Sequence, residues 1–111
     1  MCVFCDIISG KLPSRKIYED ELVYAFKDIH PQAPVHILIV PKKHIPSVAD
    51  ISEDDGALLV DIMNSAKKIA EQVGVAQSGF RLVANNGEDG GQTVAHLHFH
   101  LLGGGVLGRM C

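Results

Sequence analysis

The stretch "VAHLHFHLL", residues 94–102, alternates three histidines with apolar side chains. Successive side chains of a β-strand point to opposite faces, so this period of two predicts a strand over residues 94–102. One face then carries the histidines, and the other carries the apolar residues between them. The first set is His96, His98 and His100, and the second is Leu97, Phe99 and Leu101. Because the apolar face must meet the core, the histidine face is predicted to carry the chemistry.

Four other short segments are rich in branched and aromatic residues and are predicted strands. They are residues 16–19, 22–26, 35–40 and 80–84. A long helix is expected between the third and the fourth, with Ser52 as its N-cap and Gly74 at its end. Its apolar stripe follows helical spacing and consists of Leu58, Leu59, Ile62, Ala66, Ile69 and Val73.

The order of these elements predicts the fold class. Residues 3–8 are expected to form a short helix or turn, three strands follow, and the long helix separates them from two more strands. This order favours an α+β fold, in which a five-stranded antiparallel sheet carries one long helix and a short N-terminal helix. A length of 111 residues is enough for a single domain, residues 1–111.

Charge and cysteine content limit the classes of partner and the compartment. The net charge is −3 and no Lys/Arg block is present, which argues against binding a nucleic acid polymer. No apolar run approaches membrane-spanning length, and no signal peptide is recognisable, so we expect a cytoplasmic protein without a membrane partner. Three cysteines in a reducing compartment are not expected to form a disulfide framework, and Cys111 is assigned no role.

The residues alone leave three explanations for the histidine face. It is a solvated surface, although Glu, Lys or Thr would solvate a strand equally well. It binds one metal ion, although the outer Cβ atoms of three alternating strand positions lie roughly 13 Å apart, and Zn–N bonds are about 2.0–2.1 Å. The third explanation is separate chemistry, in which one neutral imidazole is a nucleophile and another handles a proton.

The glycine-rich segment "NNGEDGGQT", residues 85–93, favours the third explanation. It offers flexible backbone N–H groups at Gly90 and Gly91 and neutral donors at Gln92 and Thr93. Such groups suit an anionic phosphorus centre. A plain connection between strands is the alternative for this segment taken alone.

These features together resemble the histidine-triad (HIT) family. Residues 90–102, "GGQTVAHLHFHLL", are similar to its signature, and residues 2–20 and 26–44 resemble its upstream blocks, especially in the Hint branch. The resemblance implies a HIT-like fold and a homodimer with a continuous sheet across the subunits. It also implies binding of purine nucleoside monophosphates and phosphoramidates. Phosphoramidate hydrolysis or nucleotidyl transfer would pass through a covalent nucleotidyl-histidine, with no catalytic metal.

The resemblance also implies a role for each site residue. His98 would attack the α-phosphorus, His100 would contact the phosphate and help protonate the leaving group, and His36 would be a fourth histidine of the site. The phosphate oxygens would be held by Asn85, Gly91, Gln92 and Thr93. Asp28 would bind the ribose hydroxyls, and the base pocket would be walled by Phe4, Ile7, Phe26 and Ile29.

Some of these residues have simpler alternatives. Phe26 and Ile29 are equally compatible with plain core positions. Asp28 would otherwise cap the turn before Pro31, and His36 would otherwise be a buried histidine with satisfied hydrogen bonds.

A zinc site is a separate prediction. Cys2 and Cys5 have the spacing of half a zinc site, and His44 and His96 are its expected completers. Some bacterial-type HIT members, and the related galactose-1-phosphate uridylyltransferases, bind structural zinc in this way. The alternative is a pair of reduced cysteines on a short helix, with His44 in solvent.

Other functions remain open at this stage. The Fhit branch hydrolyses dinucleoside polyphosphates, although residues 27–36 and 88–93 are more similar to Hint. A nucleotide-binding regulatory protein with incidental catalysis is the alternative from another class. Residues 103–111 contain no tryptophan, whereas Hint proteins have a tryptophan-containing segment there that reaches the partner's active site.

Overall fold

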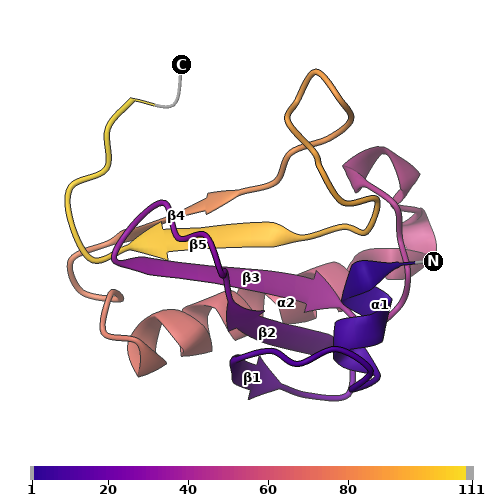
Figure 1. Cartoon of the computed structure of the whole chain (residues 1–111), viewed down its shortest axis with the longest axis horizontal. Coiled ribbons are helices and arrows are strands. Elements are labelled where there is room, and N and C mark those ends of the chain that lie inside the picture. The colour runs from indigo at the N-terminus through magenta and orange to yellow at the C-terminus, as the bar shows by residue number, and fades with distance from the viewer. Residues whose placement is uncertain (1, 110–111) are drawn as a thin grey trace.

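The computed structural model describes residues 2–109 and contains one antiparallel sheet of five strands, as the element order predicts (Figure 1). Cys111 lies outside the described residues. The strands lie in the order β1-β2-β3-β5-β4. Their bounds are β1 Lys16–Glu19, β2 Val23–Lys27, β3 Val35–Pro41, β4 Phe80–Val83 and β5 Phe99–Gly103.

Two α-helices accompany the sheet, α1 Val3–Ile8 and α2 Gly56–Gln72. Two short 3₁₀ turns, η1 Val48–Asp50 and η2 Glu53–Asp55, lead into α2. Across residues 2–109, neither helix has the length and apolar character needed to span a bilayer.

The long helix begins with a 3₁₀ turn rather than directly after Ser52. The carboxylate of Asp55 accepts hydrogen bonds from the Ser52 backbone N–H at 2.9 Å and from the Ser52 hydroxyl at 3.3 Å. This contact closes η2, and α2 continues from it. At the other end Gly74 has φ +81°, a left-handed conformation that glycine adopts at little cost and that ends a helix.

Strands β2 and β3 are buried on both faces, because α1 and α2 cover opposite sides of the sheet. On the α2 side the main core joins the helix stripe to alternate strand residues, among them Val23, Ala25, Ile37, Ile39, Ile62 and Ile69. On the α1 side a smaller core contains Phe4, Tyr24, Phe26, Leu38 and Val40. This double burial explains why residues 35–40 read as a nearly continuous apolar run.

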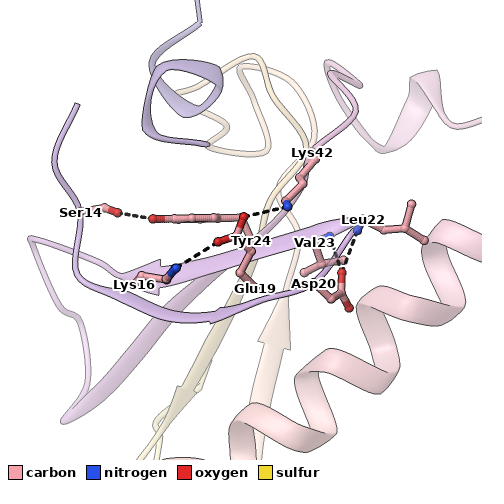
Figure 2. Close-up of polar contacts among 8 residues, drawn as sticks. All are labelled: Ser14, Lys16, Glu19, Asp20, Leu22, Val23, Tyr24 and Lys42. Carbon is pink, nitrogen blue, oxygen red and sulfur yellow. Dashed lines mark hydrogen bonds and ion pairs between the residues drawn. The ribbon is translucent and has the colours of Figure 1, made fainter. Parts of the chain in front are cut away.

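Polar contacts hold the β1–β2 hairpin at one sheet edge (Figure 2). Asp20 Oδ1 accepts hydrogen bonds from the backbone N–H groups of Leu22 and Val23, each at 2.8 Å. Glu19 lies 3.1 Å from Lys16 Nζ and 2.8 Å from Lys42 Nζ. These contacts close the turn and tie the hairpin to the end of β3.

The last strand is shorter than predicted. Residues 94–98 have no sheet pairing, and β5 begins only at Phe99. The Leu97 N–H donates to the carbonyl of Ile45 at 2.6 Å, a loop residue that follows β3. Alternation of faces nevertheless persists, because Leu97 and Leu101 are fully buried in the α2-side core and Phe99 packs against it. The predicted strand over residues 94–102 is therefore wrong at its start, whereas the predicted apolar face is confirmed.

Candidate active site and metal centre

His98 is held in one tautomer by a backbone contact. Its Nδ1 lies 2.7 Å from the carbonyl oxygen of His96, and the residue is 6 % exposed. A carbonyl only accepts hydrogen bonds, so Nδ1 must carry the proton. The lone pair of Nε2 is then free in a neutral imidazole. This is the form that a histidine nucleophile requires.

His36 and His100 form a hydrogen-bonded pair on the same side of the sheet. The Gln32 N–H donates to His36 Nδ1 at 3.0 Å, so the proton of His36 lies on Nε2. That nitrogen is 2.9 Å from His100 Nδ1 and 3.4 Å from Asp28 Oδ2. His100 Nδ1 is therefore an acceptor, which leaves its own proton on Nε2.

Burial keeps this pair neutral. It lowers the pKa of His36, although the nearby carboxylate of Asp28 partly opposes the effect. Burial, and then proximity to His98 and His36, lower the pKa of His100 to about 4. Both imidazoles are consequently uncharged at neutral pH, in agreement with the tautomers that their partners impose.

Aromatic side chains from α1 and β2 border the histidines. The ring of Phe4 meets that of His98 edge-on, with centroids 5.1 Å apart, and meets that of Phe26 at 5.6 Å. His98 and His100 are also in ring contact at 5.1 Å. Ile7 packs against the same small core. The α1 side of the sheet thus offers an apolar wall next to the imidazole of His98.

Four further side chains form a second cluster at the start of α1. The ligand atoms of Cys2, Cys5, His44 and His96 all lie within 4.8 Å of one another. His96 Nδ1 is 3.3 Å from Cys2 Sγ, 3.6 Å from Cys5 Sγ and 3.2 Å from His44 Nδ1. A tetrahedral zinc ion would place two nitrogen ligands about 3.3–3.4 Å apart and nitrogen and sulfur about 3.6 Å apart. The donor set and its spacing therefore fit such an ion.

The protonation of His96 also suits a zinc ligand. Its Nε2 lies 2.8 Å from the carbonyl of Pro41, so the proton sits on Nε2 and Nδ1 faces the cluster with its lone pair. Burial lowers the pKa of His96, which favours the neutral form that a metal ligand needs. Cys2 and Cys5 are free thiols.

The glycine-rich loop is braced by Gln92. The side-chain amide donates to the carbonyls of Pro46 at 2.7 Å and Val94 at 2.9 Å, and it accepts from the Gly87 N–H at 2.9 Å. These bonds tie the loop to the segment after β3. Thr93 at the end of the loop is exposed.

Two hollows open near these groups. One, of about 800 Å³, is lined by the 27–37 segment, including Asp28, Ile29 and His36. The other, of about 640 Å³, is lined by Cys2, Val3, Cys5 and His44 together with residues 93–95. The metal-type cluster and the end of the glycine-rich loop therefore border the same hollow.

Comparison with known proteins places the chain in a family. A family model for the HIT domain matches residues 9–106. The chain belongs to the HIT family. It is 50% identical over 108 residues, 97% of this chain and 91% of the relative, to an Escherichia coli protein named purine nucleoside phosphoramidase.

Solved HIT structures agree with this fold. A HIT family hydrolase from Legionella pneumophila superposes with a TM-score of 0.97 at 46% identity, covering 99% of this chain and 98% of that one. A histidine triad protein from Clostridium difficile gives 0.94 at 48% identity, covering 97% and 94%. The expected HIT-like α+β fold is therefore confirmed.

The structure brings most of the predicted site residues into two groups. One contains the three histidines at 36, 98 and 100, with Phe4, Phe26 and Ile7 beside them. The other is the four-residue cluster of Cys2, Cys5, His44 and His96. The position of a Cβ at Gly91 would lie 3.8 Å from Asn85 Nδ2, so these two predicted phosphate contacts are neighbours.

Two predicted site residues, Ile29 and Gln92, have surroundings that differ from those of the other predicted site residues. Ile29 is 85 % exposed and lines the hollow near Asp28, apart from the small aromatic core. Every polar atom of the Gln92 side chain already has a partner within the protein. Their roles in base and phosphate binding stay predictions.

Sequence reasoning missed three backbone groups that orient the site, the first of which is the His96 carbonyl that orients His98. The carbonyl of Pro41 orients His96, and the N–H of Gln32 orients His36. Every residue has a backbone carbonyl and every residue except proline has an N–H, so no side-chain pattern signals them.

Proposed function

We propose that this HIT protein hydrolyses purine nucleoside phosphoramidates through a covalent nucleotidyl intermediate on His98. The observation that carries the proposal is the 2.7 Å contact between His98 Nδ1 and the His96 carbonyl, which leaves Nε2 free to attack. The 50% identity to the Escherichia coli purine nucleoside phosphoramidase supports the substrate class. The net charge of −3 favours a mononucleotide over a nucleic acid polymer, and no membrane partner is proposed.

The reaction has two displacement steps at phosphorus. In the first, His98 Nε2 bonds to the α-phosphorus while the P–N bond breaks, and the amine leaves with the bonding pair and a proton from His100. In the second, the oxygen of water bonds to phosphorus, the P–Nε2 bond breaks, and a proton of the water passes to His100. A nucleoside monophosphate is released and His98 returns to its neutral form.

His100 acquires its proton because substrate binds. In the free site burial keeps the pKa of His100 at about 4. A phosphate anion next to the ring favours the charged form and raises that pKa, so binding itself prepares the acid. His36 orients His100 through the 2.9 Å contact between Nε2 and Nδ1.

The remaining predicted residues bind the nucleotide. Asp28 is proposed to accept hydrogen bonds from the ribose hydroxyls through Oδ2, since Oδ1 already accepts from the His30 N–H at 2.8 Å. The base is proposed to lie against the apolar residues Phe4, Ile7, Phe26 and Ile29. The phosphate is proposed to bind at the glycine-rich loop, near Asn85, Gly91, Gln92 and Thr93.

A structural zinc ion is proposed at Cys2, Cys5, His44 and His96. Support comes from two sulfur and two nitrogen donors at tetrahedral spacing. Such an ion would crosslink α1 to the segment after β3 and to the segment before β5. Metal analysis of protein purified without chelator should find one zinc per chain, and Cys5→Ser should remove it. Absence of stoichiometric metal from the wild type would refute the site.

We further propose a homodimer in the cytoplasm. Within residues 2–109, β4 pairs on one side only, and Phe80 on this edge strand is 37 % exposed. An open edge with an apolar side chain suits pairing with a second copy of the sheet. A reducing compartment agrees with the free thiols of Cys2 and Cys5.

Turnover assays test the catalytic proposal. Adenosine 5′-phosphoramidate should be hydrolysed faster than a diadenosine polyphosphate, which would be the better substrate of an Fhit-like enzyme. His98→Ala should reduce phosphoramidate turnover by roughly 1,000-fold or more while binding of a nucleoside monophosphate survives. Near-native rates in this variant would exclude His98 as the nucleophile.

A further inference from the structure

Residues 94–98 carry the catalytic centre but lie outside the sheet. The carbonyl that orients His98 belongs to His96, three residues before β5 begins. No ladder of sheet hydrogen bonds therefore holds this carbonyl in place. Its position must come from other contacts of the segment, because a neutral imidazole keeps one tautomer only while its partner stays aligned.

Four of these contacts are made by the His96 side chain. The ring is fully buried, and both of its nitrogens have partners. Nε2 lies 2.8 Å from the Pro41 carbonyl, and Nδ1 lies 3.2–3.6 Å from His44 Nδ1 and from the two cysteine sulfurs. The next residue, Leu97, is also anchored, by burial and by its 2.6 Å bond to Ile45.

His96 thus contributes two different groups to this region, its imidazole and its backbone carbonyl. Its imidazole belongs to the donor cluster, and its carbonyl sets the proton of His98 on Nδ1. Both are attached to the Cα of His96, so a shift of the ring that carries Cα with it also moves the carbonyl. The cluster reaches His98 by a second route as well, since Cys2 and Cys5 flank Phe4, whose ring meets His98 at 5.1 Å.

We propose that His96 is a positioning residue whose side chain, held by Cys2, Cys5 and His44, aligns the backbone carbonyl that selects the nucleophilic tautomer of His98. The cluster then supports catalysis, in addition to anchoring the N-terminal helix to the rest of the fold. Loss of the cluster should lower the rate of nucleotidyl transfer without weakening nucleotide binding. The expected fall in rate rests on the proposed function. The expected change of the His98 tautomer does not.

Nitrogen-15 NMR of histidine-labelled protein reads the tautomer directly and needs no substrate. The samples are wild type with zinc, wild type stripped by a chelator, His44→Asn and Cys5→Ser. His44 is exposed and lies outside α1, so its replacement removes one donor without altering the helix that carries Phe4. Ile69→Val, which thins the core on the far side of the sheet, controls for general destabilisation.

We expect a single His98 tautomer with the proton on Nδ1 in zinc-loaded wild type and in Ile69→Val. Stripped wild type and His44→Asn should show both tautomers. Their rate of nucleotidyl transfer should fall about 10- to 100-fold at unchanged KM, the size of effect that follows when a group that orients a functional side chain at a metal site is lost. Added zinc should restore the stripped wild type.

Three results would overturn the inference. One is an unchanged His98 tautomer in both the stripped wild type and His44→Asn. Another is an effect of Cys5→Ser on the tautomer that His44→Asn does not share, since that would assign the coupling to α1 and Phe4. The third is an equal effect of Ile69→Val. If the wild type turns over no phosphoramidate, the proposed function fails, while the tautomer measurement still decides the role of His96.

Discussion

His100 shows how its surroundings set the charge of a single side chain. The unfolded chain exposes this imidazole to water, where its pKa is near 6.5, whereas burial in the folded protein lowers the pKa to about 4. Between these two values the unfolded chain binds more protons than the folded one. The free energy of unfolding must therefore fall as the pH falls from 6.5 toward 4, and the effect of His100 is absent above about pH 7.

His100→Gln should remove this part of the pH dependence. We expect the loss of unfolding free energy between about pH 7 and about pH 4 to be smaller in the variant than in wild type, because Gln does not titrate. Urea unfolding at the two pH values measures the free energy of unfolding of each protein, with both proteins in the same metal state. Identical losses in the two proteins would contradict the low pKa of His100.

The sequence predicted side chains better than it predicted the backbone groups that orient them. Histidine alternation and the Cys-x-x-Cys spacing identified two groups of residues that the structure does bring together. The carbonyls of His96 and Pro41 were not foreseeable, because a backbone group acquires a specific role only through the path of the chain. Ile29 was proposed for the base pocket, but its large exposure reflects a loop whose course is not determined by Pro31 and Pro34 alone.

At the level of elements, the glycine-rich loop contains a tight turn that brings the backbone of Gly90 close to that of Asn86. A Cβ at Gly90 would clash with the carbonyl oxygen of Asn86, because it would come closer to that atom than Cβ atoms approach in real structures. The backbone there cannot yield as a flexible side chain would. Gly90→Ala should therefore displace the loop that precedes the catalytic histidines.

We expect Gly90→Ala to raise KM and lower kcat for the phosphoramidate, while far-UV circular dichroism stays that of the wild type. Gly105→Ala is the matched control, because a Cβ there meets no atom within 4 Å and the backbone φ is not left-handed. Steady-state kinetics of the two variants measure the difference. If Gly90→Ala had the same kinetics as Gly105→Ala, the loop would tolerate the alanine side chain at position 90 and would not bind phosphate in this conformation.

The start of the last strand was predicted wrongly for a physical reason. A period of two in the sequence reports which side chains face the core, and an extended chain alternates whether or not it pairs with a neighbour. Residues 94–98 alternate because Leu97 is buried, yet its N–H bonds to the loop residue Ile45 instead of to a strand. Elements with strong local signals, such as α2 and β3, were placed within a few residues.

At the scale of the molecule, the two helices leave part of the sheet without a covering layer. α2 packs mainly against β1, β2 and β3, and β4 lies at the far edge. Figure 1 shows β4 beside β5 at the side of the sheet away from the β1–β2 hairpin. The sequence predicted the antiparallel sheet and its apolar faces, but the strand order is a long-range property that local patterns do not contain.

The open edge predicts how the chain assembles. Sedimentation equilibrium should give the mass of a dimer, and Phe80→Glu should shift the protein toward the monomer by placing a charge on the β4 edge. Val106→Glu is the control, since Val106 is fully exposed and belongs to no strand. A wild type that stays monomeric at all concentrations, or a dimer that Phe80→Glu leaves intact, would contradict this interface.

The central claim is that His98 forms a bond to phosphorus, and trapping the intermediate tests it most directly. Protein mixed with adenosine 5′-phosphoramidate is quenched in acid-free denaturant during turnover, digested, and mapped by mass spectrometry. We predict an adenylyl adduct on the peptide that contains His98, assigned by fragmentation to that residue, and no adduct in His98→Ala. An adduct on a different residue, or rapid turnover by His98→Ala, would contradict the account.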